Sequence, residues 1–353
     1  MKKLVSLLLA LTMVLSVFSA LADTDLNSYT LDEIIAKAKE EGHVESVGMP
    51  DSWANWGDSW KLLTEKYGIA HTDDDMSSAE ELNMFANDST RDIGDVGLAF
   101  TQQAIDNDLV QPYKTTNWDS VPDWAKAEDG KWMIAYTGAT SFIFNNDLAN
   151  GQKMPTSWQD VREGTYKLTI GDVVGGATGQ GVVVATAFAF GGGLDNLQPA
   201  FDFWTEMAKA GRIDKGDILL ARIQAGEVEC GVSWSWNVLN YRDSTPNYKF
   251  TLAIPSDGSV MTGYASVISK NSDTPFAAAL AREYIFSDAG QINLAKSGAL
   301  PTRTDVVVPD EYKAFDPSTY ANAVSSFSDA EAYSNACLEV SEWWNENIIP
   351  LLN

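Results

Sequence analysis

Four tryptophans stand near the predicted ends of strands, where their rings could bind a small ligand. Trp53 and Trp56 come just after the first predicted strand, and Trp234 and Trp236 share one face of a later strand that Asn237 follows. Open parallel sheets bind their ligands beyond the strand ends. Indole rings in such a place can stack on a small molecule or hold a cation over the ring face. These residues are therefore candidate ligand contacts, with packing in the core as the alternative.

A glycine-rich segment, 175–181, precedes a predicted helix over 182–190. It lacks the Lys-Ser/Thr pair of a phosphate-binding loop and the spacing of a dinucleotide fingerprint, so we do not expect a nucleotide. The Thr178 hydroxyl and the free N–H groups of a helix N-terminus suit a polar or anionic ligand group, although a plain tight turn explains the glycines equally well. Ser77 and Ser78 present the same choice, and for them simple helix capping is the favoured interpretation.

No catalytic or metal-binding motif is recognisable in the sequence. The chain has only two histidines, which disfavours zinc sites and most Ser-His-Asp hydrolases. Ser233 is not part of a nucleophile elbow, and the 49 acidic residues are too many for any pair to stand out as the acid and nucleophile of a glycosidase. We therefore expect a binding protein with no catalytic residue, no metal and no cofactor. Cys230 and Cys337 could form one disulfide, but two buried thiols are slightly favoured.

The first 22 residues have the pattern of a secretory signal peptide. Lys2 and Lys3 precede an almost entirely apolar stretch over 4–18, and the small-x-small pattern of residues 20–22 predicts cleavage after Ala22. The apolar stretch is too short to span a bilayer, and no cysteine lies near the cleavage site to carry a lipid anchor. We expect a periplasmic or extracellular protein. Its net charge of −25 disfavours binding to nucleic acid or to anionic membranes.

Strands and helices alternate along the mature chain, which predicts an α/β protein with largely parallel sheets. A capping box at Thr30 and Glu33 opens the first helix, and Gly42 ends it. A second series of units begins near Lys167, so we expect two closely joined α/β blocks. The further predicted strands are 93–100, 132–145, 167–172, 228–236, 250–254 and 263–269, and the further predicted helices are 56–67, 198–210, 219–225, 275–286 and 289–296.

Five segments spread over most of the mature chain carry a resemblance to a known family. They are 46–56, 92–97, 118–125, 221–237 and 284–303. Together they resemble the type II extracytoplasmic solute-binding proteins of ABC importers, in the branch that contains ferric-iron, thiamine, polyamine, phosphonate and sugar-phosphate binders. The last segment is the most specific of the five.

The resemblance implies a two-lobed periplasmic-binding-protein type II fold with the ligand cleft between the lobes and a two-segment hinge near 136–141 and 255–264. Lobe 1 would comprise 23–137 and 260–310, lobe 2 would comprise 138–259, and the C-terminal helices within 311–353 would pack on the body. Thr140 and Tyr264, which lie in the hinge segments, are further candidate ligand contacts. Ligand binding would close the lobes of a monomeric protein, which would then dock on a membrane permease that works with its ATPase.

Departures from the family's patterns narrow the ligand class. Ferric-ion binders have adjacent tyrosines where this chain has Ser-Trp-Ser-Trp at 233–236, so iron is disfavoured. An amine, polyamine or thiamine-like cation would suit Asp51 together with the four tryptophans, and we favour this class. A phosphorylated or phosphonate ligand, the alternative, would suit Ser77, Ser78 and Thr178, with Arg91. A secreted carbohydrate-binding or glycoside-processing protein and a periplasmic sensor are open as other functional classes.

Overall fold

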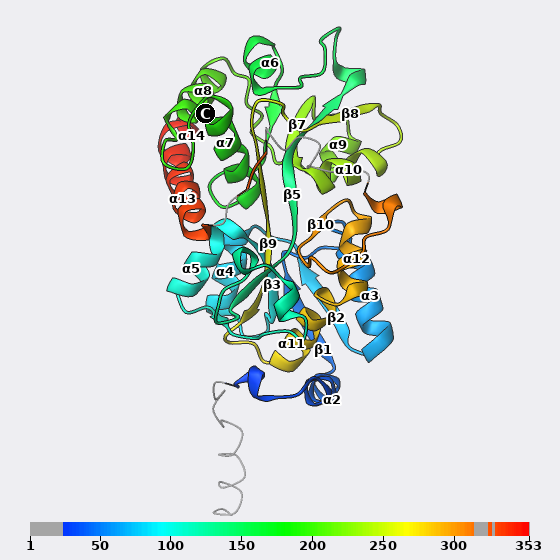
Figure 1. Cartoon of the computed structure of the whole chain (residues 1–353). Coiled ribbons are helices and arrows are strands. Elements are labelled where there is room, and N and C mark those ends of the chain that lie inside the picture. The colour runs from blue at the N-terminus through cyan, green and yellow to red at the C-terminus, as the bar shows by residue number, and fades with distance from the viewer. Residues whose placement is uncertain (1–23, 314–323, 327–328, 353) are drawn as a thin grey trace, which may run out of the picture.

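The long strand β5 (Trp132–Asn145) takes part in both sheets of the protein and joins its two halves. The computed structural model describes residues 24–313, 324–326 and 329–352, so the predicted leader lies outside the described residues. Figure 1 shows β5 and β9 (Ser259–Ser269) running side by side through the middle of the molecule, with α/β layers at both ends. These two strands are the framework on which the halves are placed.

The first sheet has the strand order β2–β1–β3–β9–β5. In it β1 (His43–Val47) pairs in parallel with β2 (Ala70–Asp74) and β3 (Ile93–Gly97), whereas β9 is antiparallel to both β3 and β5. Three short strands extend it, of which β4 (Val110–Gln111) and β11 (Val324–Ser326) pair with β9 and β10 (Leu300–Pro301) pairs with β5.

The second sheet uses the end of β5. Here β7 (Cys230–Trp234) and β8 (Phe250–Ala253) are antiparallel to β5, and β6 (Leu168–Thr169) is parallel to β7. Along β5, the pairing with β9 runs as far as Ala139, and the pairing with β7 begins at Thr140. The chain therefore changes sheets inside the first segment that was predicted as a hinge.

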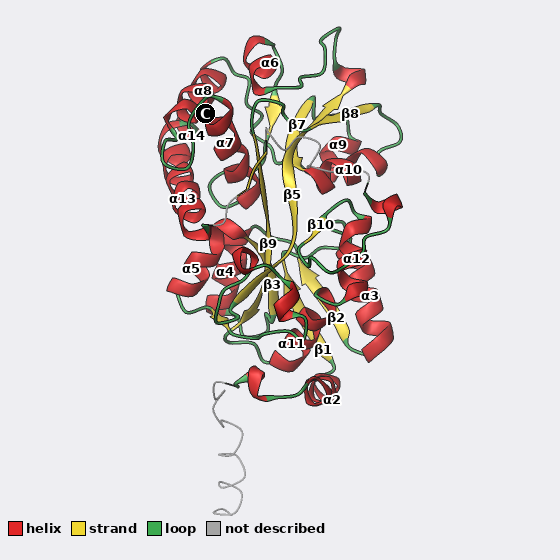
Figure 2. Cartoon of the chain, in the orientation of Figure 1, coloured by secondary structure: helices red, strands yellow, loops and turns green. Residues whose placement is uncertain are grey.

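Helices cover both sheets, as Figure 2 shows. The helices of the first half are α2 (Leu31–Glu41), α3 (Trp56–Tyr67), α4 (Ser78–Asn87), α5 (Thr101–Asp106), α11 (Pro275–Ile285) and α12 (Asp288–Lys296), with short 3₁₀ turns η1 (Leu26–Ser28), η2 (Leu98–Phe100), η3 (Trp118–Ser120), η4 (Asp123–Ala125) and η6 (Asp310–Tyr312). Those of the second half are η5 (Asn146–Leu148), α6 (Trp158–Glu163), α7 (Ala177–Ala189), α8 (Gln198–Lys209), α9 (Leu220–Gln224) and α10 (Ser235–Asp243).

Local sequence signals set the ends of the first helix as predicted. The backbone N–H and the hydroxyl of Thr30 both donate to the Glu33 carboxylate, at 2.9 and 2.8 Å. At the other end Gly42 takes a left-handed conformation with φ of 74°. The capping box and the terminal glycine are both confirmed.

Several predicted strand and helix boundaries are wrong, and two of them lie near the cavity described below. The predicted strand 228–236 ends at Trp234 and α10 begins at Ser235, so Trp236 and Asn237 lie on the first turn of a helix and not on a strand face. In addition α7 begins at Ala177, inside the glycine-rich segment, which places Thr178 on its first turn. A short apolar run fits a buried strand and a helix equally well, and tertiary contacts decide between them.

The C-terminal helix α13 (Ala330–Asn347), followed by α14 (Ile349–Leu352), packs along one side of both halves. The Ser334 hydroxyl donates to the Ala99 carbonyl in the first half. In the second half the Trp343 ring stacks on Phe201 with centroids 4.1 Å apart, and the Ser341 hydroxyl donates to the Val174 carbonyl at 2.7 Å. This helix is therefore a third link between the halves.

Cys230 and Cys337 are both free and buried, which confirms the favoured interpretation. Within the described ranges, no helix has the length and apolar character that a membrane span needs.

Candidate functional site

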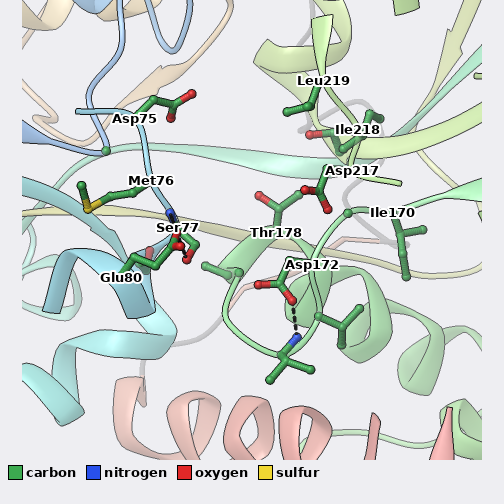
Figure 3. A pocket seen from close by; sticks show the side chains of 18 of the residues that line it. Asp75, Met76, Ser77, Glu80, Ile170, Asp172, Thr178, Asp217, Ile218 and Leu219 are labelled. Atoms are coloured by element: carbon green, nitrogen blue, oxygen red, sulfur yellow. Dashed lines mark hydrogen bonds between the residues drawn. The ribbon is translucent and has the colours of Figure 1, made fainter. Parts of the chain in front are cut away.

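A cavity of about 590 Å³ lies between the two halves. The first half lines it with the segments around Trp53 and 75–81, and the second half with the segments 170–178 and 213–219. Figure 3 shows Asp75, Ser77 and Glu80 on one side of this space and Asp172, Thr178 and Asp217 on the other. Because both halves contribute to its wall, the cavity is the candidate ligand site.

Carboxylates dominate the polar part of the cavity wall. They are Asp75, Glu80, Glu81 and Asp95 from the first half and Asp172, Asp214 and Asp217 from the second, whereas Lys215 is the only basic residue among the described residues that line the cavity. Asp214 is paired with Arg222 at 2.7 Å, and Arg222 itself is not part of the wall. The remaining carboxylates give the cavity a strongly negative potential.

The carboxylates of the two halves also repel each other. Burial and then the nearby Glu80 carboxylate raise the pKa of Asp75. Burial raises the pKa of Asp217 too, with Asp172 on the same side and Glu80 on the opposite side adding to the shift. Among the described residues, no three His, Cys, Asp or Glu side chains are grouped so as to hold a metal ion. An organic cation between the halves would relieve this repulsion.

Two of these carboxylates accept hydrogen bonds next to helix starts at the cavity. The Ser77 N–H and hydroxyl donate to Glu80 at 2.9 and 2.7 Å, at the start of α4. The N–H groups of Val174 and Gly175 donate to Asp172 at 2.8 and 2.9 Å, just before α7. Of the candidate donors for an anionic ligand group, Ser77 already donates to a carboxylate of the chain, whereas the Thr178 hydroxyl contacts the Tyr264 hydroxyl and the Trp234 indole.

The inner wall of the cavity contains a pair of buried carboxyl groups, Asp95 on β3 and Glu81 on α4. Asp95 is 1% exposed, and its Oδ2 accepts hydrogen bonds from the Tyr136 hydroxyl at 2.5 Å and the Trp56 indole at 3.0 Å. Its Oδ1 has no hydrogen-bond partner among the described residues. Burial raises the pKa of Asp95 to about 7, and burial followed by the neighbouring Asp95 raises the pKa of Glu81 well above its ordinary value.

Aromatic side chains border the same wall. The half-buried Trp53 donates from Nε1 to the Tyr136 hydroxyl at 2.8 Å and meets the Tyr264 ring edge-on, with centroids 5.4 Å apart. The Tyr264 hydroxyl lies 3.0 Å from the Thr178 hydroxyl, which also accepts a hydrogen bond from the Trp234 indole at 2.9 Å. Trp53 and Tyr264 line the cavity, whereas the buried Trp234 does not line it and lies behind them.

The candidate residues divide into two groups. Trp53, Ser77, Ser78, Thr178 and Tyr264 line the cavity, so the structure brings together residues that are far apart in the sequence. Asp51 is exposed and is not among the lining residues, and Trp56, Thr140, Trp234, Trp236 and Asn237 are almost fully buried behind the wall. A ligand contact for this second group stays a prediction.

Burial gives the inner tryptophans packing roles. Trp56 stacks on Trp60 and donates to Asp95, and Trp236 stacks on Trp234 with centroids 5.7 Å apart. The strand-end position alone suggested ligand contact for Trp236, but its place on the first turn of α10 directs it into the core.

Sequence reasoning missed the carboxylates Asp75, Glu81, Asp95, Asp172 and Asp217. Two of them carried a usable signal. Asp95 interrupts the apolar pattern of a buried strand, and Glu81 lies on the same face of α4 as the buried Ser78, Leu82 and Phe85. An acidic residue at a core position is uncommon and indicates a special environment.

The sequence matches the family model of bacterial extracellular solute-binding proteins over residues 88–325. No curated protein matches the chain. Among solved structures, the periplasmic binding protein AfuA from Actinobacillus pleuropneumoniae, with bound fructose 6-phosphate, has a TM-score of 0.72 at 17% identity and covers 87% of this chain and 98% of its own. The periplasmic binding protein P5PA has a TM-score of 0.72 at 14% identity, with 87% and 99% covered. A putative spermidine/putrescine ABC transporter structure from Listeria monocytogenes has a TM-score of 0.64 at 16% identity, with 85% and 98% covered.

The structural matches confirm the predicted fold class, an α/β fold with two lobes and a cleft between them. The family works in the periplasm or outside the cell and passes a small molecule to a membrane permease. The family model covers most of the chain. The chain therefore belongs to the bacterial extracellular solute-binding proteins, the binding components of ABC importers.

Proposed function

We propose that this protein captures an organic cation, an amine, a polyamine or a thiamine-like compound, and delivers it to its permease by closure of the two lobes. The observation that supports this most is the charge of the cavity, whose wall has carboxylates on both sides and a single lysine. A cation held between opposing carboxylates gains Coulomb energy from both lobes at once. The rings of Trp53 and Tyr264 add cation–π attraction at the same wall.

Direct contacts between the halves indicate how closure would hold the ligand. The Ala79 N–H donates to the Gly175 carbonyl at 3.3 Å, and the Asn240 side chain donates to the Ser52 carbonyl at 2.9 Å. With the lobe boundaries at 23–137 with 260–310 and at 138–259, both bonds cross the cleft. Such contacts form only when the lobes come together, so a ligand that neutralises the carboxylates would favour them.

A phosphorylated or phosphonate ligand is the second candidate. AfuA, which is similar in fold, was solved with fructose 6-phosphate, and two helices begin at this cavity. The Ser77 N–H and hydroxyl already bind Glu80, and the N–H groups of Val174 and Gly175 already bind Asp172, so a carboxylate lies beside each helix start. A phosphate would meet these carboxylates at close range, and like charges repel. The cation is therefore favoured.

A thermal-shift panel tests the ligand class. Putrescine, spermidine and thiamine are compared with fructose 6-phosphate, methylphosphonate and maltose, each at several concentrations. A ligand present at about one hundred times its Kd stabilises the folded state by about 2.7 kcal/mol, which raises Tm by several degrees. We expect stabilisation by at least one of the cations and by none of the anions. Stabilisation by a phosphorylated compound alone would contradict the proposal, and stabilisation by maltose alone would favour a carbohydrate-binding role.

Trp53→Ala should weaken binding of the stabilising cation by about tenfold, because the ring at the cavity wall supplies stacking and cation–π contact. Trp124→Ala is the matched control, since Trp124 is 39% exposed and lies away from the cavity. Isothermal titration calorimetry measures both variants. Equal affinities for Trp53→Ala and the wild-type protein would remove Trp53 from the site.

A further inference from the structure

The Glu81–Asp95 pair occupies a niche that the surrounding backbone leaves for it. A Cβ atom at Gly48 would lie 2.6 Å from the Glu81 carboxyl carbon, and a Cβ atom at Gly94 would lie 2.8 Å from its Oε2. Oε2 also accepts the Asp95 backbone N–H at 3.0 Å. The two glycines therefore make room for a carboxyl group beneath the cavity floor, and a side chain at either position would displace it.

The groups that face this pair from the neighbouring elements are acidic or neutral. They are Tyr136 on β5, Tyr264 on β9, Asp73 on β2 and Trp56 on α3. Neither carboxyl forms a salt bridge within the described part of the chain. Two neighbouring buried carboxyl groups, with no cation beside them, cannot both be ionised near neutral pH. Without ligand, the pair therefore holds a proton.

One carboxyl oxygen of the pair lacks a hydrogen-bond donor among the described residues. Asp95 and Glu81 both line the cavity, yet the Asp95 Oδ1 is buried and has no hydrogen-bond partner among the described residues. A buried oxygen without a donor is costly, and an ammonium group brings up to three donors and a positive charge. Trp53 and Tyr264, which also line the cavity, place aromatic rings beside that position.

We propose that an ammonium group of the ligand binds at the Glu81–Asp95 pair and displaces the proton that the two carboxyls share, so that the protein takes up its cation by exchange for a proton. This inference rests on the proposed function, an organic-cation ligand. The ammonium nitrogen donates to Asp95 Oδ1, and the displaced proton leaves to the solvent. The protein then binds its ligand more tightly as pH rises, because the proton competes for the same site.

The direction and size of the pH dependence of ligand affinity follow from the thermodynamic linkage between proton binding and ligand binding. Burial raises the pKa of Asp95 to about 7, so Asp95 holds a proton below that pH, and a ligand that binds at its carboxyl group must release this proton there. Each binding event releases close to one proton at acidic pH, and affinity rises by up to about tenfold per pH unit until it levels off above the pKa. At higher pH the pair has already lost this proton, so the release falls toward zero.

Calorimetry at several pH values, from about pH 5.5 to about pH 8.5, measures the released protons directly when each titration is repeated in two buffers of different ionisation enthalpy. The titrant is whichever of putrescine, spermidine and thiamine stabilises the protein most. Proton release near one per ligand at the acidic end, falling with rising pH, supports the exchange. Binding with no proton release across this range overturns the inference and leaves the proposed function intact. If none of the three cations binds at any pH, the proposed function fails and the inference fails with it.

Variants of the two carboxyl residues test whether the displaced proton comes from this pair. Asp95→Asn and Glu81→Gln remove the carboxyls while keeping the side-chain size, and we expect each to lower affinity by at least about tenfold and to flatten the pH profile. The control is Glu128→Gln, at an exposed position outside the cavity, which should keep the wild-type profile. Wild-type proton release in Asp95→Asn would overturn the assignment. If a variant fails to fold, the proton count on the wild-type protein still decides.

Discussion

Gly97→Ala should weaken ligand binding by at least about tenfold while leaving the protein folded. Gly97 ends β3 in the first half, and a Cβ atom there would lie 2.2 Å from the Ala177 Cβ at the start of α7 in the second half. Two carbon atoms cannot approach so closely, so the halves must separate at this point. Separation opposes the closed form that we propose for the bound state, and its cost appears as lost affinity.

A second substitution tests whether the clash between the halves is the cause. In the double variant Gly97→Ala with Ala177→Gly, the nearest remaining atom of residue 177 is its Cα at 3.7 Å, an ordinary contact distance. The double variant should therefore regain most of the wild-type affinity, measured by calorimetry with the stabilising cation. Small-angle scattering of the single variant should show a more open molecule. An unchanged affinity in Gly97→Ala, or no recovery in the double variant, would contradict this interpretation.

Arg282→Met should lower the free energy of unfolding by at least about 3 kcal/mol, the largest stability effect that we expect. Arg282 on α11 is fully buried, and its guanidinium donates to the carbonyls of Tyr113 at 3.1 Å, Gly130 at 3.0 Å and Ser266 at 2.8 Å. Methionine fills most of the volume but donates nothing. The carbonyls then lose this charged donor, and the Gly130 carbonyl keeps only the Tyr113 N–H at 3.0 Å. Each lost hydrogen bond in the core costs free energy.

Urea unfolding followed by circular dichroism measures this loss. The control is Arg242→Met, because the Arg242 side chain is 42% exposed and forms an ion pair with its neighbour Asp243. Such an exposed ion pair contributes about 1 kcal/mol or less. Both variants lose one positive charge, so the difference between their losses in free energy of unfolding measures the effect of burial at Arg282. A similar small loss in both would show that the buried guanidinium does not hold its carbonyl partners as the structure indicates.

The elements of the fold could largely be predicted, because their signals are local. The capping residues Thr30 and Ser77 and the terminal glycine Gly42 mark helix ends through contacts a few residues apart. Likewise β5 has the predicted bounds 132–145, since a long apolar run in a β pattern needs no distant partner to be recognised. The errors at 177 and 235 fall where apolar runs fit both a strand and a helix, and contacts from other elements decide between them.

The site could be predicted only in part. Trp53, Thr178 and Tyr264 do lie at the cavity, and each was a candidate because of its position, after a predicted strand, at a predicted helix start and in a predicted hinge segment. The carboxylates were not found, because 49 acidic residues give no reason to choose Asp172 or Asp217 over the rest. Only their positions relative to each other make them a site.

The sequence by itself determined the family and the α/β class, because short-range patterns and characteristic segments persist along the chain. Only the tertiary structure decided which charges meet across the cleft, that Trp236 packs in the core, and that Glu81 and Asp95 form a buried pair. Electrostatic energy and desolvation depend on distances between residues far apart in the chain, and the fold alone sets those distances.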